Sequence, residues 1–313
     1  MKLLETSELP DTAKVVNFAC VGATTTISYD PDAAARTLRA LEEFACFRAN
    51  ATIPVELGGF NTLAAVDVAA RHDLPVMDAD GAGRAVPEVH LKVYTIDGIP
   101  LTPMVIADSQ ARNVVLVRET VNAKAAERIA RSLATQWNHF AYTARRILTG
   151  AQVKTSPIQM TLSKSIRVGR ILRKAVEPVE AVLKETGGRR LFEGIVQNVE
   201  RVAEAGFTFI KVKLAGVCGY AGNSFELVAK NEILVAYWNK RLAAIAPDII
   251  TPVHPEKGTC VTAEEIEKDD RLTILGLPSP DRWKKRKGLE LWKEAMTEAG
   301  ITEEYRSLDS LDP

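Results

Sequence analysis

The segment from Pro54 to Glu88 constrains the fold more than any other part of the chain, because it combines glycines and acidic residues with the pattern of buried strands. It reads PVELGGFNTLAAVDVAARHDLPVMDADGAGRAVPE. Residues 51–57 are a mostly apolar run that stops at a Gly-Gly pair, Asn61 follows as a helix N-cap, and a second apolar run covers 75–77. The segment therefore predicts a strand, a helix and a second strand.

Acidic residues stand at the ends of both predicted strands. Glu56 lies at the end of the first strand and Asp78 follows the second. A strand-helix-strand crossover makes the two strands parallel, so their carboxyl ends share the edge where open α/β sheets bind ligands. The next loop adds Asp80, Arg84 and Glu88, and such crowding of charges shifts pKa values apart. We take these five residues as catalytic candidates.

Substrate-binding candidates come mainly from the same segment: Gly58, Gly59, Asn61, Gly81, Gly83 and His90, with His254 from a loop of the second half. An alternative for the acidic loop is structural, with Arg84 forming a salt bridge to Asp78 or Asp80 to fix a Gly-rich turn. The sequence leaves the metal ligands open and contains no nucleotide or flavin motif.

The composition predicts a two-domain protein. The chain has 313 residues, 46% of them hydrophobic, and a net charge of zero. We expect an α/β domain with a mixed, largely parallel sheet at 1–152. A connecting helix, a β-rich domain and a helical tail follow at 153–313.

Charge and cysteine usage exclude several functional classes. The Lys and Arg residues are dispersed except at 282–287, which argues against a nucleic-acid partner. No stretch reaches the roughly 20 apolar residues of a membrane span, and no signal peptide opens the chain. The cysteines lack metal-ligand spacing. We expect a cytoplasmic protein with a small-molecule substrate, no membrane partner, and either homo-oligomers or a second pathway subunit as its protein partner.

Further elements follow from hydrophobic periodicity. We expect strands at 13–21 and 89–96, an antiparallel strand pair at 103–107 and 113–118, and a helix that begins at Asp30-Pro31. A long helix is predicted from Asn122 through Ile147 to a stop at Gly150, with an apolar stripe that includes Ala125, Ile129 and Leu133. A helix at 163–185 and strands at 191–199, 207–214, 225–237, 248–253 and 271–276 complete the prediction.

The sequence resembles the S-methyl thiohydantoin desulfurase family, formerly a domain of unknown function, at ELGGFN, DADGAGRAVPE, PDIITPVHPEKGTCVT and GLPSP. The resemblance implies a two-domain enzyme of hydantoin metabolism that removes the sulfur substituent of a thiohydantoin by hydrolysis. The family's pattern falls on Glu56, Gly58, Gly59, Asn61, Asp78, Asp80, Gly81, Gly83, Arg84, Pro87 and Glu88. The family's usual Gly-rich N-terminal segment is missing ahead of 13–21, and His90 stands where the family more often has an apolar or amide residue.

Hydrolysis of such a ring needs a base for water and a donor for the charge that builds on the ring. We expect Asp78 or Glu56 as the base with the other as the acid, Arg84 as the charge stabiliser, and Asn61 with the Gly58-Gly59 backbone for ring recognition. One alternative is a divalent-metal-dependent hydrolase of a related cyclic amide, with Asp78, Asp80, Glu88 and His90 as ligands. Another is a non-catalytic ligand sensor or a partner subunit of a hydantoin-pathway enzyme.

Overall fold

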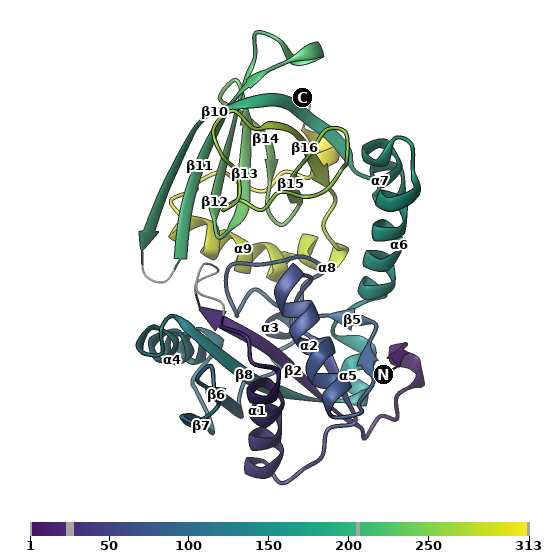
Figure 1. Ribbon diagram of the computed structural model, residues 1–313, viewed down its shortest axis with the longest axis vertical. Helices are drawn as coiled ribbons and strands as arrows, with labels where there is room; N and C mark the ends of the chain where they lie inside the picture. Colours follow the sequence, from purple (N-terminus) through teal and green to yellow (C-terminus); the bar gives the residue numbers. More distant parts are fainter. Residues whose placement is uncertain (1, 23–27, 205–206, 312–313) are drawn as a thin grey trace. The chain divides into compact units, whose positions relative to one another are not determined.

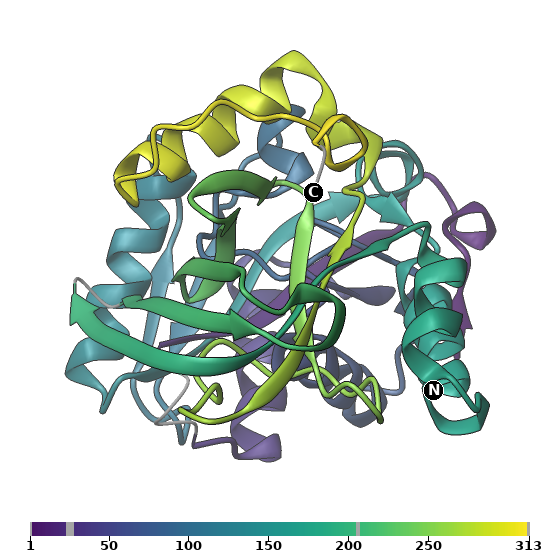
Figure 2. The same cartoon turned by 90° about the horizontal axis from the view of Figure 1, so that it is seen from above.

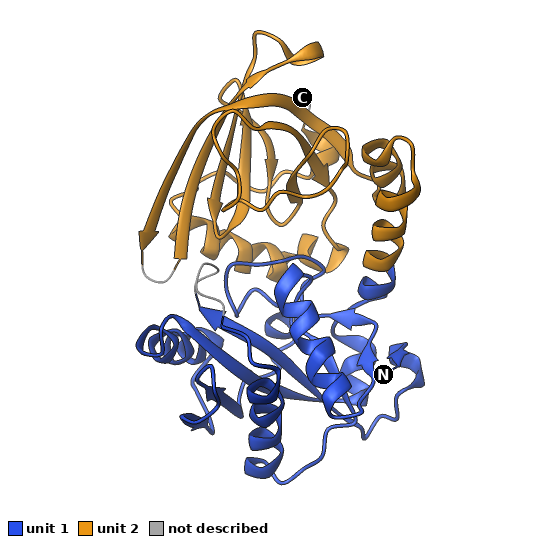
Figure 3. Ribbon diagram, viewed as in Figure 1, with its two compact units in different colours: residues 1–163 blue, residues 164–313 orange. Residues whose placement is uncertain are grey.

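Two compact units, residues 1–163 and 164–313, make up the chain (Figure 3). The computed structural model describes residues 2–22, 28–204 and 207–311. The sequence predicts the division after residue 152, whereas the structure has it between Ser163 and Lys164. The reason is that β9 (Ile158–Gln159) pairs with β5 (Ala79–Asp80), which keeps the chain up to this point in the first unit.

A mixed sheet forms the centre of the first unit (Figure 1). Its order is β1-β4-β3-β2-β8-β6-β7. The strands are β1 (Leu3–Leu4), β2 (Lys14–Gly22), β3 (Ala51–Pro54), β4 (Val76–Met77), β6 (Met104–Ala107), β7 (Val114–Val117) and β8 (Phe140–Thr149). Strands β1, β4, β3 and β2 are joined by parallel pairs, whereas β8, β6 and β7 are added antiparallel. The predicted α/β class with a mixed sheet is confirmed.

Helices cover both faces of this sheet. The crossover helices α1 (Pro31–Phe44) and α2 (Gly59–Arg71) pack on the face that carries Val16 and Phe18 of β2. Val15 and Val21 point to the opposite face, toward α5 (Gly150–Thr155) and α4 (Ala123–Gln136) respectively. Alternation along β2 thus explains the layered core. The short helices η1 (Thr6–Glu8) and α3 (Val93–Ile96) complete the unit.

The predicted long helix from Asn122 to Ile147 is wrong in its second half. Helix α4 ends at Gln136, and Asn138 and His139 adopt the left-handed conformation (φ 55° and 61°) before β8 begins. Phe140 and Ala144 are spaced as on a helix, but Tyr142 between them packs into the same core, which is the two-residue period of a strand.

Two smaller predictions in the first unit are also wrong. Residues 89–96 do not form a strand, because the segment runs irregularly into α3. Asn61 is not an N-cap: the cap is Gly58, and Asn61 lies inside the first turn of α2. Its side chain is thereby directed to other partners.

The second unit is β-rich, as predicted. Helix α6 (Thr161–Lys174) begins within the first unit, and its remainder together with α7 (Pro178–Thr186) leads into an antiparallel sheet of order β14-β13-β12-β11-β10-β16-β15. The strands are β10 (Arg189–Glu204), β11 (Phe207–Gly216), β12 (Ser224–Lys230), β13 (Glu232–Trp238), β14 (Arg241–Ile245), β15 (Ile249–Val253) and β16 (Arg271–Leu277), with η3 (Cys218–Tyr220) between β11 and β12. Strand β14 was not predicted.

The predicted single helix at 163–185 is instead two helices, because Pro178 starts a new one. The predicted strand at 225–237 is instead the hairpin of β12 and β13, which turns at Asn231 (φ 57°). The tail contains α8 (Asp281–Lys284), α9 (Arg286–Glu298) and η4 (Leu308–Ser310). Figure 2 shows α9 in yellow. Trp292 and Met296 of α9 line a hollow together with Ile245 of β14.

Candidate active site

Glu56 and Asp78 follow neighbouring parallel strands, as the sequence predicts. Thr52 of β3 pairs in parallel with Val76 of β4, so both strands end at the same edge of the sheet. Both residues are buried, with exposed fractions of 9% and 2%. Their carboxylates, however, bind different parts of the first unit.

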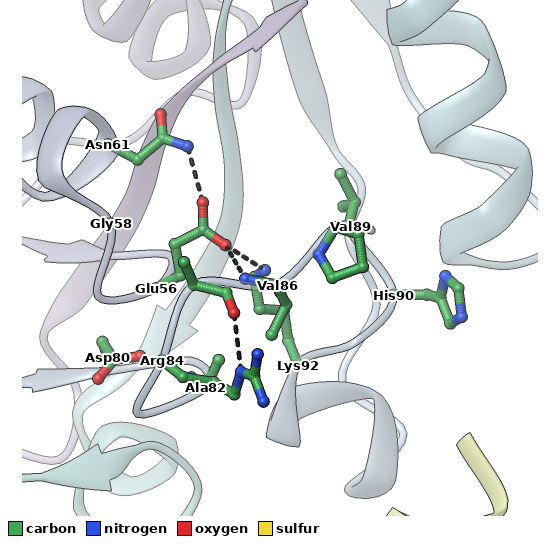
Figure 4. Close-up of polar contacts among 12 residues, drawn as sticks. Glu56, Gly58, Asn61, Asp80, Ala82, Arg84, Val86, Val89, His90 and Lys92 are labelled. Carbon is green, nitrogen blue, oxygen red and sulfur yellow. Dashed lines mark hydrogen bonds and ion pairs between the residues drawn. The ribbon is translucent and has the colours of Figure 1, made fainter. Parts of the chain in front are cut away.

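The Glu56 carboxylate is held by three donors (Figure 4). Oε1 accepts a hydrogen bond from Asn61 Nδ2 at 2.8 Å, and Oε2 accepts from Lys92 Nζ at 3.0 Å and from the Val86 N–H at 3.2 Å. Burial alone would raise the pKa of Glu56, but Lys92, Asn61 and Val86 together lower it below its usual value. Glu56 is therefore a fixed carboxylate at neutral pH, which suits it poorly to act as an acid.

Asn61 uses both ends of its amide within the protein. While Nδ2 donates to Glu56, Oδ1 accepts from the Cys20 N–H at 2.9 Å. Gly58 and Gly59 begin α2 beside it, and the Gly58 N–H donates to the Thr62 hydroxyl at 3.2 Å. This arrangement fixes the strand-to-helix turn after β3.

Asp78 caps a helix from a distant part of the sequence. Its Oδ1 accepts from the N–H groups of Leu162 and Ser163, each at 2.9 Å, at the start of α6. Its backbone carbonyl accepts from the Met160 N–H at 2.7 Å. Carboxylates satisfy the free N–H groups of a helix N-terminus in this way.

The carboxyl group of Asp80 has no exposed surface. Oδ1 accepts from the Ala82 and Gly83 N–H groups at 2.6 and 2.7 Å, whereas Oδ2 accepts no hydrogen bond within the described residues. Burial raises the pKa of Asp80 to about 6, against the opposing effects of those two N–H groups, the Thr161 hydroxyl and the Lys92 charge. Asp80 can therefore gain or lose a proton near neutral pH.

The glycines of the acidic loop are required by close packing. A Cβ on Gly81 would lie 2.6 Å from Val55 O and 2.7 Å from the Tyr94 ring, and Gly83 has a φ of 71°. Arg84 is buried and donates from Nε to the Ala85 carbonyl at 2.9 Å. The loop thus holds its side chains in fixed positions at the sheet edge.

Glu88 and His90 lie apart from the Glu56 carboxylate. Figure 4 shows the His90 ring pointing away from Glu56 and Asp80. His90 Nδ1 is 3.4 Å from Glu88 Oε2 and 3.9 Å from Glu127 Oε2, and all three side chains are buried. His254 belongs to the second unit, in the loop after β15, where its N–H donates to the Thr259 carbonyl at 3.0 Å.

The sequence reasoning missed three buried charges of this site: Lys92, Glu127 and Arg145, which are 4%, 5% and 3% exposed. Arg145 Nη1 makes no hydrogen bond with the described residues, and burial lowers the pKa of Arg145 to about 10 although Glu56 and Glu127 oppose the shift.

The sequence contained a signal for Glu127, but the apolar stripe of the helix was predicted one position too early. The buried face of α4 carries Ala126, Ala130 and Ala134, one position later than the predicted stripe, and Ile129 is 38% exposed. With the correct stripe, Glu127 borders the buried face and stands out as a charge directed inward. Lys92 and Arg145 carried no such signal, because each lies in a segment whose secondary structure was predicted incorrectly.

The arrangement brings together a fixed carboxylate at Glu56, a titrating carboxyl group at Asp80, and buried cations at Lys92 and Arg145. Such a combination can hold a small polar molecule, move one proton and stabilise a developing negative charge.

Comparisons with known proteins match both halves of the chain. Residues 1–118 match the model of the S-Me-THD-like N-terminal domain, and residues 121–297 match the model of the S-Me-THD-like C-terminal domain. The boundary between the two models precedes α4 and β8, although β8 belongs to the first sheet and α4 packs on it in the structure.

A crystal structure of a protein from Chromobacterium violaceum has the same fold. Its TM-score is 0.83 at 23% sequence identity, and the alignment covers 99% of this chain and 88% of that chain. A search of curated proteins found no match. Within the described residues, no helix is long and apolar enough to cross a membrane.

Proposed function

Because the chain belongs to the S-Me-THD-like family over both of its domains, a thiohydantoin-related function follows, and we propose that it hydrolyses the bond between ring carbon and sulfur in an S-substituted thiohydantoin. The observation that carries this proposal is the Asp80 carboxyl group, which is fully buried in the DADGAGR loop, has a pKa of about 6 and has one oxygen without a hydrogen bond from the described residues. A general base works best when its pKa lies near the working pH.

Asp80 fits the role of base better than the two carboxylates first considered. Glu56 is committed to Lys92 and Asn61, and Asp78 is committed to the start of α6. Asp80 combines an oxygen, Oδ2, that accepts no hydrogen bond within the described residues with a pKa of about 6. Since its side chain is closed to solvent, substrate binding at Asp80 must involve a local rearrangement of the residues around it.

The reaction balances with water as the only co-substrate. Asp80 takes one proton from water as the oxygen adds to the ring carbon that carries sulfur, and the electrons of the carbon–nitrogen double bond move to the ring nitrogen. The carbon–sulfur bond then breaks, and the sulfur leaves as a thiol with the proton returned by Asp80. The hydroxyl proton passes to the ring nitrogen as the carbonyl forms. The product is the corresponding hydantoin.

Buried cations support the step in which negative charge builds on the ring. Arg145 Nη1 is a donor without a hydrogen-bond partner in the described part of the chain, and Lys92 is held at Glu56 by a 3.0 Å contact. In a site shielded from water, such donors stabilise a developing anion more strongly than they would in solvent. Arg84 remains the motif's own candidate for the same role.

The test is an assay of thiol release by the purified full chain. S-methyl thiohydantoin and a panel of other S-substituted thiohydantoins are the substrates. Asp80→Asn is compared with a variant of an exposed aspartate that pairs with Lys154, Asp11→Asn. We expect Asp80→Asn to lower turnover by about 100-fold or more while Asp11→Asn retains it. A wild-type protein inert to the whole panel would instead support the sensor alternative.

A further inference from the structure

Glu88, His90 and Glu127 form a second cluster of buried titratable side chains, separate from Asp80. These residues offer ligand atoms that all lie within 4.8 Å of one another. Glu88 and His90 come from the loop before α3, and Glu127 comes from α4. The three side chains thus converge from two segments of the first unit.

The imidazole of His90 is the observation that points to a ligand. The residue is 2% exposed, and neither Nδ1 nor Nε2 makes a hydrogen bond within the described residues. Buried polar atoms without partners are rare because each costs free energy. Nδ1 nevertheless faces one oxygen of Glu88 and one of Glu127, at 3.4 and 3.9 Å.

These separations suit a shared metal ion better than direct hydrogen bonds. Two ligands about 2.1 Å from a zinc ion at a tetrahedral angle lie about 3.4 Å apart. The Nδ1 to Glu88 Oε2 distance is 3.4 Å, and the Glu127 oxygen, at 3.9 Å, fits a wider angle. Neither distance is within the normal range of a hydrogen bond between nitrogen and a carboxylate.

The surroundings of Glu127 orient one of its oxygens toward the cluster. Arg131 binds Oε1 at 2.9 Å from the exposed side, and the Val89 N–H donates to Oε2 at 2.9 Å. Contacts of this kind commonly orient ligating carboxylates.

We propose that Glu88, His90 and Glu127 form a binding site for one divalent transition-metal ion of the manganese-to-zinc series. An imidazole with two carboxylates suits these ions, whereas calcium and magnesium prefer oxygen ligands alone. Three protein ligands leave a coordination position open for water or substrate. The site goes beyond the function proposed above and does not rest on it, since metal binding is measured without substrate.

The experiment uses the full chain, stripped with a chelator, reloaded separately with Zn²⁺ or Mn²⁺ and freed of excess ion by gel filtration. The wild type should retain about one metal ion per chain and melt about 5 °C higher than the stripped protein. His90→Asn and Glu127→Gln should bind at least tenfold more weakly. His72→Asn is the matched control, because its ring Nε2 lies 3.0 Å from the Ala35 carbonyl, outside the cluster, and it should bind like the wild type.

A measurement on the unaltered protein covers the case in which these variants fail to fold. The chain has four histidines. Substoichiometric Mn²⁺ should broaden the ring proton NMR signals of His90 more strongly than those of the other three. A wild type that retains no metal, equal retention by all variants, or strongest broadening at another histidine would each overturn the proposal. Thiol release by the stripped protein is assayed separately, so that loss of the metal site and loss of the proposed function are distinguished.

Discussion

Asp78 and Asp80 stand two residues apart in one loop, yet their surroundings assign them different roles. Asp78 satisfies the N-terminus of α6, whereas Asp80 binds the N–H groups of its own turn and is left with an unbonded oxygen among the described contacts. The two side chains are buried to a similar extent, so their different roles come from their different hydrogen-bond partners.

This environment predicts that Asp80 reduces stability at neutral and alkaline pH. Its folded pKa, about 6, lies above the ordinary value of 3.8, so the folded protein binds the proton more tightly than the unfolded chain does. The resulting penalty is absent below 3.8, grows between 3.8 and about 6, and is complete above this range. We expect Asp80→Asn to raise the free energy of unfolding at pH about 8 by up to about 3 kcal/mol relative to the wild type. The variant should therefore unfold at a higher urea concentration.

The same comparison at pH about 4 provides the internal control, since the gain should largely disappear there. Asp11→Asn should show no such pH-dependent gain, because that carboxylate is exposed. A destabilised Asp80→Asn at pH about 8 would contradict the account of its environment.

The buried pair of Glu56 and Lys92 makes a second prediction. Lys92→Met leaves the Glu56 carboxylate buried, with Asn61 and the Val86 N–H as its remaining hydrogen-bond donors among the described residues. We therefore expect a loss of about 3 kcal/mol in the free energy of unfolding. The double variant Glu56→Gln with Lys92→Met removes both charges and should recover part of that loss. Urea unfolding of the two single variants and the double variant measures the coupling; strictly additive losses would count against a charge pair.

For individual residues, the sequence predicted that Glu56 and Asp78 lie at the same edge of the sheet. It did not predict the partners of their side chains. The edge follows from local order, strand then helix then strand. The partners lie far along the chain: Lys92 for Glu56, and Leu162 and Ser163 for Asp78. Local patterns do not encode such contacts.

Among the elements, α6 depends on a cap supplied by another segment. Replacing Asp78 with alanine removes the acceptor for two N–H groups at the start of α6, whereas asparagine keeps an acceptor oxygen. We expect Asp78→Ala to lower the free energy of unfolding by about 1–2 kcal/mol and Asp78→Asn to cost much less. Thermal and urea unfolding of both variants test this, and equal losses would show that the carboxylate charge, rather than the cap, matters.

Gly81 in the loop after β5 and Gly59 at the start of α2 allow a matched pair of glycine substitutions. Gly81→Ala places a Cβ against Val55 O and the Tyr94 ring, whereas a Cβ on Gly59, at the start of α2, meets nothing within 4 Å. We expect Gly81→Ala to destabilise the protein by about 1–3 kcal/mol through overpacking, and Gly59→Ala to be neutral or stabilising by up to about 1 kcal/mol. Equal melting temperatures for the two variants would contradict the close packing at Gly81.

Element prediction succeeded where local signals were strong. Asp30 accepts a hydrogen bond from the Asp32 N–H at 2.9 Å with proline in the first turn, as expected of the start of α1. It failed at β8, because apolar residues spaced four apart fit both a helix and a strand. Pairing with β2 and β6 decides in favour of the strand, and that pairing is a tertiary effect.

For the whole molecule, the order of an α/β unit followed by a β-rich unit was predictable from the sequence, and the family resemblance was confirmed by matches over both domains. The position of the division was harder to predict. It depends on the short pairing of β5 with β9, which closes the acidic loop from the far end of the first unit. Strands of two residues leave almost no periodicity to detect.

The central claim is that Asp80 is the base of a thiohydantoin hydrolase, and the pH dependence of kcat/KM for thiol release tests it most directly. Wild-type activity should rise about tenfold per pH unit below the Asp80 pKa of about 6 and level off above it. Asp80→Asn should be about 100-fold slower and should lose this inflection. An unchanged profile in Asp80→Asn, or a wild type that releases no thiol at any pH, would contradict the account.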